Sequence, residues 1–140
     1  MIRHIAPADC DAIAALEASL FATALDQARL MALQTNPVFC GFVDLVPDQD
    51  RPQSILANNL GSYLGGYLLA MMIDDEAEIL SIGVTPDRQM QGVGKRLLQH
   101  FFDHCTSRKM ARVVLEVAED NVPALGLYRD FGFAEFGHRK

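Results

Sequence analysis

A loop containing two glycines joins an apolar segment to an amphipathic one, and this unit constrains the fold of the chain most strongly. The apolar segment, residues 78–84, predicts a strand that ends before Pro86, because proline cannot donate a hydrogen bond to a sheet ladder. Apolar residues at helical spacing follow the loop, namely Val93, Leu97, Leu98, Phe101, Phe102 and Cys105. This spacing predicts a helix with one face in the core, and it makes Cys105 a core residue rather than a nucleophile.

The loop between these two elements has the properties of a phosphate-binding site. The first N–H groups of a helix have no intrahelical partner, and the positive end of the helix dipole lies there. Gly92 and Gly94 carry no Cβ, so a phosphate could approach the backbone closely. The loop is therefore expected to cradle a pyrophosphate group.

Two common phosphate-binding motifs are excluded by the neighbouring residues. A P-loop requires glycine at the position of Gln89 and Ser or Thr at the position of Arg96. A dinucleotide-binding fingerprint requires a third glycine at the position of Leu97. The remaining pattern is Gln-x-x-Gly-x-Gly between a strand and a helix.

The rest of the sequence predicts an α/β fold with a mixed parallel and antiparallel central sheet, flanked by helices. Strands are expected over residues 1–5, 38–46, 62–73, 78–84 and 112–118 and from 133 onward, and helices over residues 7–20, 24–34, 93–108 and 121–132. The second half alternates strands and helices, which implies crossovers and at least two parallel strands. Gly65 and Gly66 predict a bulge or close packing within their strand. We expect a single domain over residues 1–140, since this length supports one core.

Charge and composition narrow the classes of partner. Residues 1–85 carry three basic and eleven acidic side chains, whereas residues 86–140 carry nine basic and seven acidic ones. The basic half suits an anionic cofactor and the acidic half a cationic amine, although acidic loops could equally serve solubility. No basic patch with interleaved aromatic residues suggests nucleic-acid binding, and no apolar run reaches the ~20 residues of a membrane span.

Cysteine usage and the start of the chain indicate a cytoplasmic protein without a metal site. The three cysteines are scattered and have no metal-ligand spacing, so free thiols in a reducing compartment are expected. His100 and His104 are four residues apart, but no metal-binding motif accompanies them. Residues 1–5 lack the apolar core of a signal peptide.

Glu116 is the strongest candidate for a catalytic base. It lies in the nearly apolar segment 112–118, where burial of a carboxylate is costly and raises its pKa toward neutrality. A general base at neutral pH needs such a pKa. The alternative is a structural carboxylate that accepts hydrogen bonds from backbone N–H groups at the end of the sheet.

Two polar residues share one face of the short helix that is expected after this strand. Tyr128 lies seven residues after Asn121, and its hydroxyl could donate a proton to a leaving thiolate. A tyrosine at this position could instead only pack the helix on the sheet. Asn121 could likewise be a helix N-cap.

Two parts of the chain together resemble the GNAT acetyltransferase superfamily. The loop Gln89-x-x-Gly92-x-Gly94 resembles its acyl-CoA loop. The second part resembles the closing segment of the superfamily and consists of Leu115-Glu116-Val117, Asn121, Leu127-Tyr128 and Phe131-Gly132-Phe133. The match covers about residues 77–136 and looks most like the bacterial ribosomal-protein-alanine N-acetyltransferases, which acetylate the N-terminal amine of a protein.

This resemblance implies a GNAT fold, acetyl-CoA as co-substrate and a role for each matched residue. Glu116 would accept the proton of the amine, Tyr128 would protonate the CoA thiolate, and Asn121 would bind the cofactor. Backbone groups of residues 82–84 would pair with the pantetheine arm, and the loop would hold the pyrophosphate. The implied cofactor-binding residues are Ile82, Gly83, Val84, Gln89, Met90, Gln91, Gly92, Val93, Gly94, Lys95 and Asn121.

The favoured acceptor is a protein N-terminal α-amine, for example that of a ribosomal protein. The alternatives are a small-molecule amine, such as a polyamine or an aminoglycoside, and a non-catalytic acyl-CoA-binding module. The chain departs from the ribosomal enzymes after the first helix, where they carry Phe-Pro-Trp and residues 20–24 read Leu-Phe-Ala-Thr-Ala. The family pattern continues with another strand beyond the position of Lys140, so either the sequence is truncated there or this last strand is missing.

Overall fold

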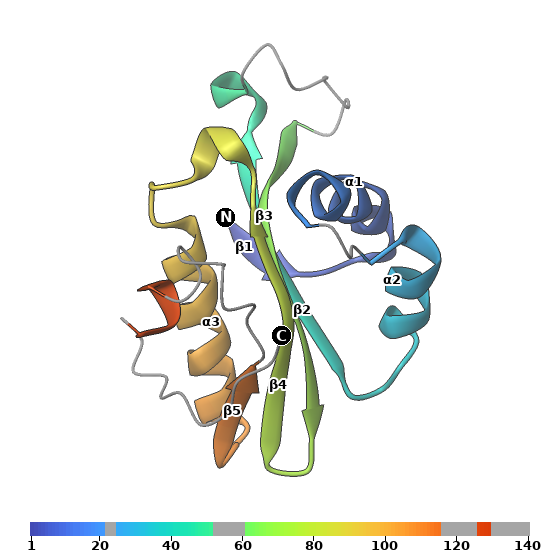
Figure 1. Ribbon diagram of the computed structural model, residues 1–140, viewed down its shortest axis with the longest axis vertical. Helices are drawn as coiled ribbons and strands as arrows, with labels where there is room; N and C mark the ends of the chain where they lie inside the picture. The colour runs from blue at the N-terminus through green and yellow to red at the C-terminus, as the bar shows by residue number, and fades with distance from the viewer. Residues whose placement is uncertain (22–24, 52–60, 116–125, 130–140) are drawn as a thin grey trace.

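A five-stranded sheet forms the centre of the computed structural model, which describes residues 1–21, 25–51, 61–115 and 126–129 (Figure 1). The strands are β1 (Ile2–His4), β2 (Phe39–Pro47), β3 (Ser62–Ile73), β4 (Glu76–Val84) and β5 (Arg112–Leu115). The helices are α1 (Cys10–Leu20), α2 (Gln27–Gln34) and α3 (Val93–Ser107), with single 3-10 turns at Pro7–Asp9, Asp48–Asp50 and Pro86–Arg88. Residues 126–129 are also helical.

The sheet is mixed, as the sequence predicts. Its spatial order is β1-β2-β3-β4-β5, and the first four strands are antiparallel neighbours. β5 pairs with β4 in parallel, after the chain has crossed over through α3. The second half therefore supplies the parallel pair and the first half the antiparallel strands.

Helices cover both faces of the sheet, α1 and α2 on one side and α3 on the other (Figure 1). Side chains alternate along the strands, so each face has its own core. The α3-side core consists of Cys40, Phe42, Leu68, Ala70, Ala77, Ile79, Val93, Leu97, Leu98, Phe101 and Cys105. The α1-side core consists of Cys10, Ile13, Leu16, Leu30, Val43, Tyr67 and Leu69. The predicted core position of Cys105 is confirmed.

Some element boundaries differ from the sequence prediction for local reasons. α2 begins at Gln27 rather than at residue 24, because the Asp26 side chain accepts a hydrogen bond of 2.8 Å from the Arg29 N–H and caps the helix. β4 begins at Glu76, because the turn before it is completed by Asp74, whose φ is 55°, and Asp75. Most of the predicted last helix and the predicted last strand lie outside the described residues.

The two glycines of β3 have the two roles that the sequence predicts as alternatives, a bulge and close packing. Gly65 is an extra residue in β3, because Leu64 and Gly66 pair with consecutive residues of β2. A Cβ on Gly66 would lie 2.8 Å from Cγ1 of Val93 and 3.2 Å from Cδ1 of Leu97. The start of α3 can therefore sit directly on the sheet only because residue 66 has no side chain.

A second bulge interrupts β4 and has no counterpart in the sequence prediction. Leu69 pairs with Ser81 and Ala70 pairs with Ile79, so Leu80 is the extra residue. The pairing of β4 with β5 ends at Ile79 within the described residues. The bulge therefore lies just beyond the described part of this parallel pairing and just before residues 82–84.

Candidate active site

Two residues in a left-handed conformation turn the chain from the end of β4 into α3. Met90 has φ 66° and its side chain is fully exposed, and Gly92, the N-cap of α3, has φ 81°. The left-handed conformation explains the glycine at position 92. Gly92 also has no side chain with which to cap the helix, so the first N–H groups of α3 remain available to an anion.

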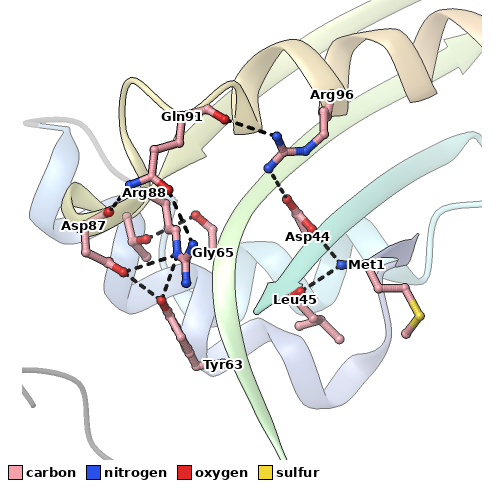
Figure 2. A network of polar contacts seen from close by, with 10 residues as sticks. Met1, Asp44, Leu45, Tyr63, Gly65, Asp87, Arg88, Gln91 and Arg96 are labelled. Atoms are coloured by element: carbon pink, nitrogen blue, oxygen red, sulfur yellow. Dashed lines mark hydrogen bonds and ion pairs between the residues drawn. The ribbon is translucent and has the colours of Figure 1, made fainter. Parts of the chain in front are cut away.

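A polar network holds the loop in this shape (Figure 2). The Tyr63 hydroxyl on β3 donates to Oδ2 of Asp87 at 2.7 Å, and Nε of Arg88 donates to the Tyr63 oxygen at 3.1 Å. Burial alone would raise the pKa of Asp87, but hydrogen bonds from Tyr63 and Thr85 and the Arg88 charge outweigh it and lower that pKa. The loop is thus anchored to the sheet through an ionised carboxylate.

The two loop glutamines, both predicted to bind the cofactor, donate from their side chains to carbonyls of the same loop. Nε2 of Gln89 donates to the Val84 oxygen at 3.2 Å, and Nε2 of Gln91 donates to the Asp87 oxygen at 2.8 Å. These amides therefore shape the loop. A bound phosphate would meet the backbone of the loop first.

Arg96, in the first turn of α3, links this loop to β2 (Figure 2). Its Nη1 donates to the Gln91 carbonyl at 3.1 Å, and its Nη2 lies 3.5 Å from Oδ2 of the buried Asp44. The other Asp44 oxygen accepts from the Met1 ammonium at 3.0 Å. The buried carboxylate is thus paired with two cations, as burial of a charge requires. Lys95 is exposed in the same helical turn.

The end of β4 lies beside this loop, and its side chains divide between the two faces of the sheet. Ile82 and Val84 pack against the α3-side core. Gly83 lies under the ring of Tyr67, where a Cβ would approach ring atoms to 2.5 Å. All three predicted pantetheine-binding residues therefore follow the Leu80 bulge and precede the loop.

The described helical segment 126–129 packs on the start of α3. A Cβ on Gly94 would lie 3.1 Å from Cδ2 of Leu127, so this glycine allows a close contact between the two helices. Tyr128 is half-buried against the α3-side core, and burial raises its pKa to about 12. Its hydroxyl is therefore protonated at neutral pH, as a proton donor must be.

The predicted base and one predicted cofactor ligand lie outside the described residues. Glu116 follows Leu115, the last described residue of β5, and Asn121 lies within the undescribed segment 116–125. Both roles remain predictions.

A cavity of about 490 Å³ lies away from this region. It is lined by residues from the ends of β1, β2, β3 and α3, including His4, Cys40, Met72, His104 and Arg108, and by none of the predicted site residues. Burial raises the pKa of the Cys40 thiol to about 11, so at neutral pH this thiol is not a nucleophile. We therefore place the candidate site at the loop and β4. In the described part of the chain, no three metal-binding side chains are grouped to hold an ion.

Sequence analysis missed a buried carboxylate on α1. Glu17 is only 2% exposed and accepts hydrogen bonds from the hydroxyls of Tyr67 on β3 and Ser81 on β4. Its position gives a signal that could have found it, because it lies one turn after Ile13 and next to Leu16. A carboxylate within the apolar stripe of a helix needs hydrogen-bond donors from the facing elements.

Comparison with known proteins places the chain in a family. The model of the Acetyltransferase (GNAT) family matches residues 21–133. The [ribosomal protein bS18]-alanine N-acetyltransferase of Escherichia coli (strain K12) is 38% identical over 72 residues, which are 51% of this chain and 49% of that protein. A mycothiol acetyltransferase of Clavibacter michiganensis subsp. michiganensis is 32% identical over 129 residues, 91% of this chain and 40% of that protein. The chain thus spans about half the length, or less, of these two curated relatives.

Solved structures show the same fold. The crystal structure of the ribosomal-protein-S18-alanine N-acetyltransferase from Escherichia coli superposes with a TM-score of 0.79 at 26% identity, over 98% of this chain and 79% of that one. Arabidopsis thaliana NAA60 in complex with acetyl-CoA superposes with a TM-score of 0.79 at 18% identity, over 98% of this chain and 85% of that one, and shows the fold alone. Within the described residues, no helix is both long and apolar enough to cross a membrane. The family match, which spans most of the chain, and the mixed sheet that carries the glycine loop together show that this chain is a member of the GNAT acetyltransferase family.

Proposed function

We propose that this chain transfers an acetyl group from acetyl-CoA to a primary amine, and that the favoured acceptor is the N-terminal α-amine of a protein. The observation that carries the proposal is the arrangement of the loop. The start of α3, which follows β4 through left-handed Met90 and Gly92, has no side-chain cap. Leu127, the neighbour of the half-buried Tyr128, packs on Gly94 in the first turn of this helix.

In this proposal, the chain binds acetyl-CoA along β4 and at the start of α3. The backbone of residues 82–84, which follows the Leu80 bulge, pairs with the amide groups of the pantetheine arm. The N–H groups of the loop and of the first turn of α3 hold the pyrophosphate. Lys95 adds a positive charge on the exposed side of that turn.

The proposed reaction is direct acetyl transfer. Glu116 takes a proton from the acceptor ammonium, and the free amine attacks the thioester carbonyl carbon and forms the new C–N bond. A backbone N–H near Val84 stabilises the oxyanion. The C–S bond then breaks, and Tyr128 donates its proton to the CoA thiolate. The nitrogen of the new C–N bond loses its second proton, which restores the Tyr128 hydroxyl, and Glu116 releases its proton to solvent. The products are a neutral amide and CoA.

The preference for a protein N-terminus rests on one relative. The Escherichia coli relative, whose name states a ribosomal-protein alanine acceptor, matches this chain in sequence and in fold. The excess of acidic side chains in residues 1–85 suits any cationic amine, so it is compatible with both kinds of acceptor.

Two observations favour a second candidate, a small-molecule amine. The match to mycothiol acetyltransferase covers 91% of this chain, whereas the match to the bS18-alanine enzyme covers 51%. Residues 20–24 also lack the Phe-Pro-Trp segment that the sequence comparison leads us to expect for a ribosomal acceptor.

The test is mass spectrometry of the full chain incubated with acetyl-CoA and a set of acceptors. The set contains peptides that begin with alanine, the same peptides with a blocked N-terminus, polyamines and aminoglycosides. We expect one acetyl group on the free N-terminus of the peptides and none on the blocked ones. Acetylation of the small amines alone would establish the second candidate. CoA binding without any transfer would instead indicate a binding module.

A further inference from the structure

Glu17 on α1 is a buried ionisable group that the proposed reaction does not use. Its side chain lies among the apolar residues of the α1-side core, where a carboxylate costs free energy unless donors satisfy it. It is also far in sequence from its hydroxyl partners, 50 residues from Tyr67 and 64 from Ser81. The fold therefore brings three separate elements together at this carboxylate.

Three donors converge on the two oxygens of Glu17. The hydroxyls of Tyr67 and Ser81 both donate to Oε1, and the backbone N–H of Leu25 donates to Oε2 at 3.1 Å. Burial, followed by the hydrogen bond to Glu17, raises the pKa of Tyr67, so this hydroxyl keeps its proton and remains a donor. The cluster is thus a fixed set of hydrogen bonds to one carboxylate.

This cluster contacts residues 81–83 of β4, the region to which the proposed function assigns the binding of acetyl-CoA. Ser81 directly follows the bulged residue Leu80, and the Tyr67 ring lies on the backbone of Gly83. Both contacts come from the face of the sheet opposite α3. Residues 81–83 are therefore held from the α1 face directly after the bulge in β4.

We propose that Glu17 is a positioning residue for acetyl-CoA, which fixes the backbone of residues 81–83 through Ser81 and Tyr67. This inference rests on the proposed function, because it assigns a purpose to the strand that would hold the pantetheine arm. Through the Leu25 N–H, the same carboxylate also fixes residue 25, just before the N-cap of α2, relative to β4. A shift of the thioester by about 1 Å can cost ~10²-fold in rate, so such a fixed strand has a catalytic consequence.

Calorimetry and kinetics of Glu17→Gln and Ser81→Ala test this inference. In Glu17→Gln the amide oxygen can still accept hydrogen bonds, but the NH₂ group faces the Leu25 N–H, and two donors cannot pair. Ser81→Ala removes one hydroxyl donor and leaves Glu17 in place. We expect the Kd for CoA to rise about 5- to 10-fold in Glu17→Gln and less in Ser81→Ala, as for the loss of one or two hydrogen bonds. The KM for acetyl-CoA should rise in parallel, while the KM for the amine should stay within about 2-fold.

Ile13→Val is the matched control. Ile13 is buried on the same face of α1, but its side chain does not take part in the hydrogen bonds of Glu17. This variant should lower Tm through lost packing and leave the Kd for CoA unchanged.

Two results would overturn the inference. One is a Glu17→Gln protein with lower Tm or lower binding stoichiometry but unchanged Kd, which would mean that Glu17 only stabilises the fold. The other is an equal rise of Kd in Ile13→Val. The calorimetry measures CoA binding and does not require acetyl transfer. A wild-type protein that binds CoA but acetylates no amine would therefore contradict the proposed function. The comparison of Kd between Glu17→Gln and Ile13→Val would still test the role of Glu17.

Discussion

At the scale of single residues, the glycines and glutamines of the loop between β4 and α3 determine its shape. Gly92 is required by its left-handed backbone, whereas the small size of Gly94 serves a contact with Leu127. The side chains of Gln89 and Gln91 close hydrogen bonds within the loop. A substitution at Gly94 would therefore disturb helix packing as well as any phosphate contact.

Tyr128→Phe tests whether the hydroxyl is an acid or only part of a packed ring. A thiolate with a pKa of ~8.5 needs little help to leave, so kcat should fall about 10-fold, less than is typical for loss of a general acid. Because burial raises the pKa of Tyr128 to about 12, wild-type kcat should not decline around pH 10, where an exposed tyrosine would ionise. The measurement is kcat from pH 6 to 10.5 for both proteins. An unchanged rate in the variant would reduce Tyr128 to a packing residue.

At the scale of elements, α3 contributes to both the candidate site and the core. Its start carries the loop and its apolar face forms one of the two cores. Its second half packs on β2, where the rings of His100 and His104 lie 4.6 and 5.5 Å from that of Phe42. Charge at the start of α3 should therefore control ligand binding, and charge near its end should control stability.

Lys95→Glu tests the start of α3 as an anion site. Reversing an exposed charge in the first turn should raise the Kd for CoA about 10-fold, and the effect should shrink at high salt. Lys109→Glu is the matched control, since it makes the same change in net charge just beyond the other end of α3. Calorimetry at low and high ionic strength makes the comparison. Equal affinities for the two variants would contradict the pyrophosphate assignment.

His104 makes stability depend on pH. Burial is the largest cause that lowers its pKa, followed by the charges of Arg108, His4 and His100. The unfolded chain then takes up this proton more readily than the folded one, so stability should fall as pH drops below the ordinary histidine value of 6.5. Thermal unfolding at pH 7.5 and pH 5.5 should show a smaller loss of Tm for His104→Gln than for the wild type. Equal losses would show that His104 does not contribute.

At the scale of the whole molecule, sequence reasoning succeeded where the signal is local. The 3.6-residue period of α3, the glycines of β3 and the strand–loop–helix order predict the mixed sheet and the loop, and the structure confirms them. The Leu80 bulge could not be predicted, because no Gly or Pro marks it in β4. The role of Glu17 could not be predicted either, because its hydroxyl partners are 50 and 64 residues away. Glu116 and Asn121 remain predictions from the sequence.

Single-turnover acetyl transfer tests the central claim most directly. Wild type and Glu116→Gln are each saturated with acetyl-CoA and mixed with a peptide that begins with alanine, with Glu78→Gln, an exposed carboxylate on β4, as the control. We predict that Glu116→Gln slows transfer by ~10²–10⁴-fold with CoA affinity nearly unchanged, and that Glu78→Gln transfers like the wild type. Equal rates for wild type and Glu116→Gln would contradict the account, and a loss in Glu78→Gln alone would move the base to β4.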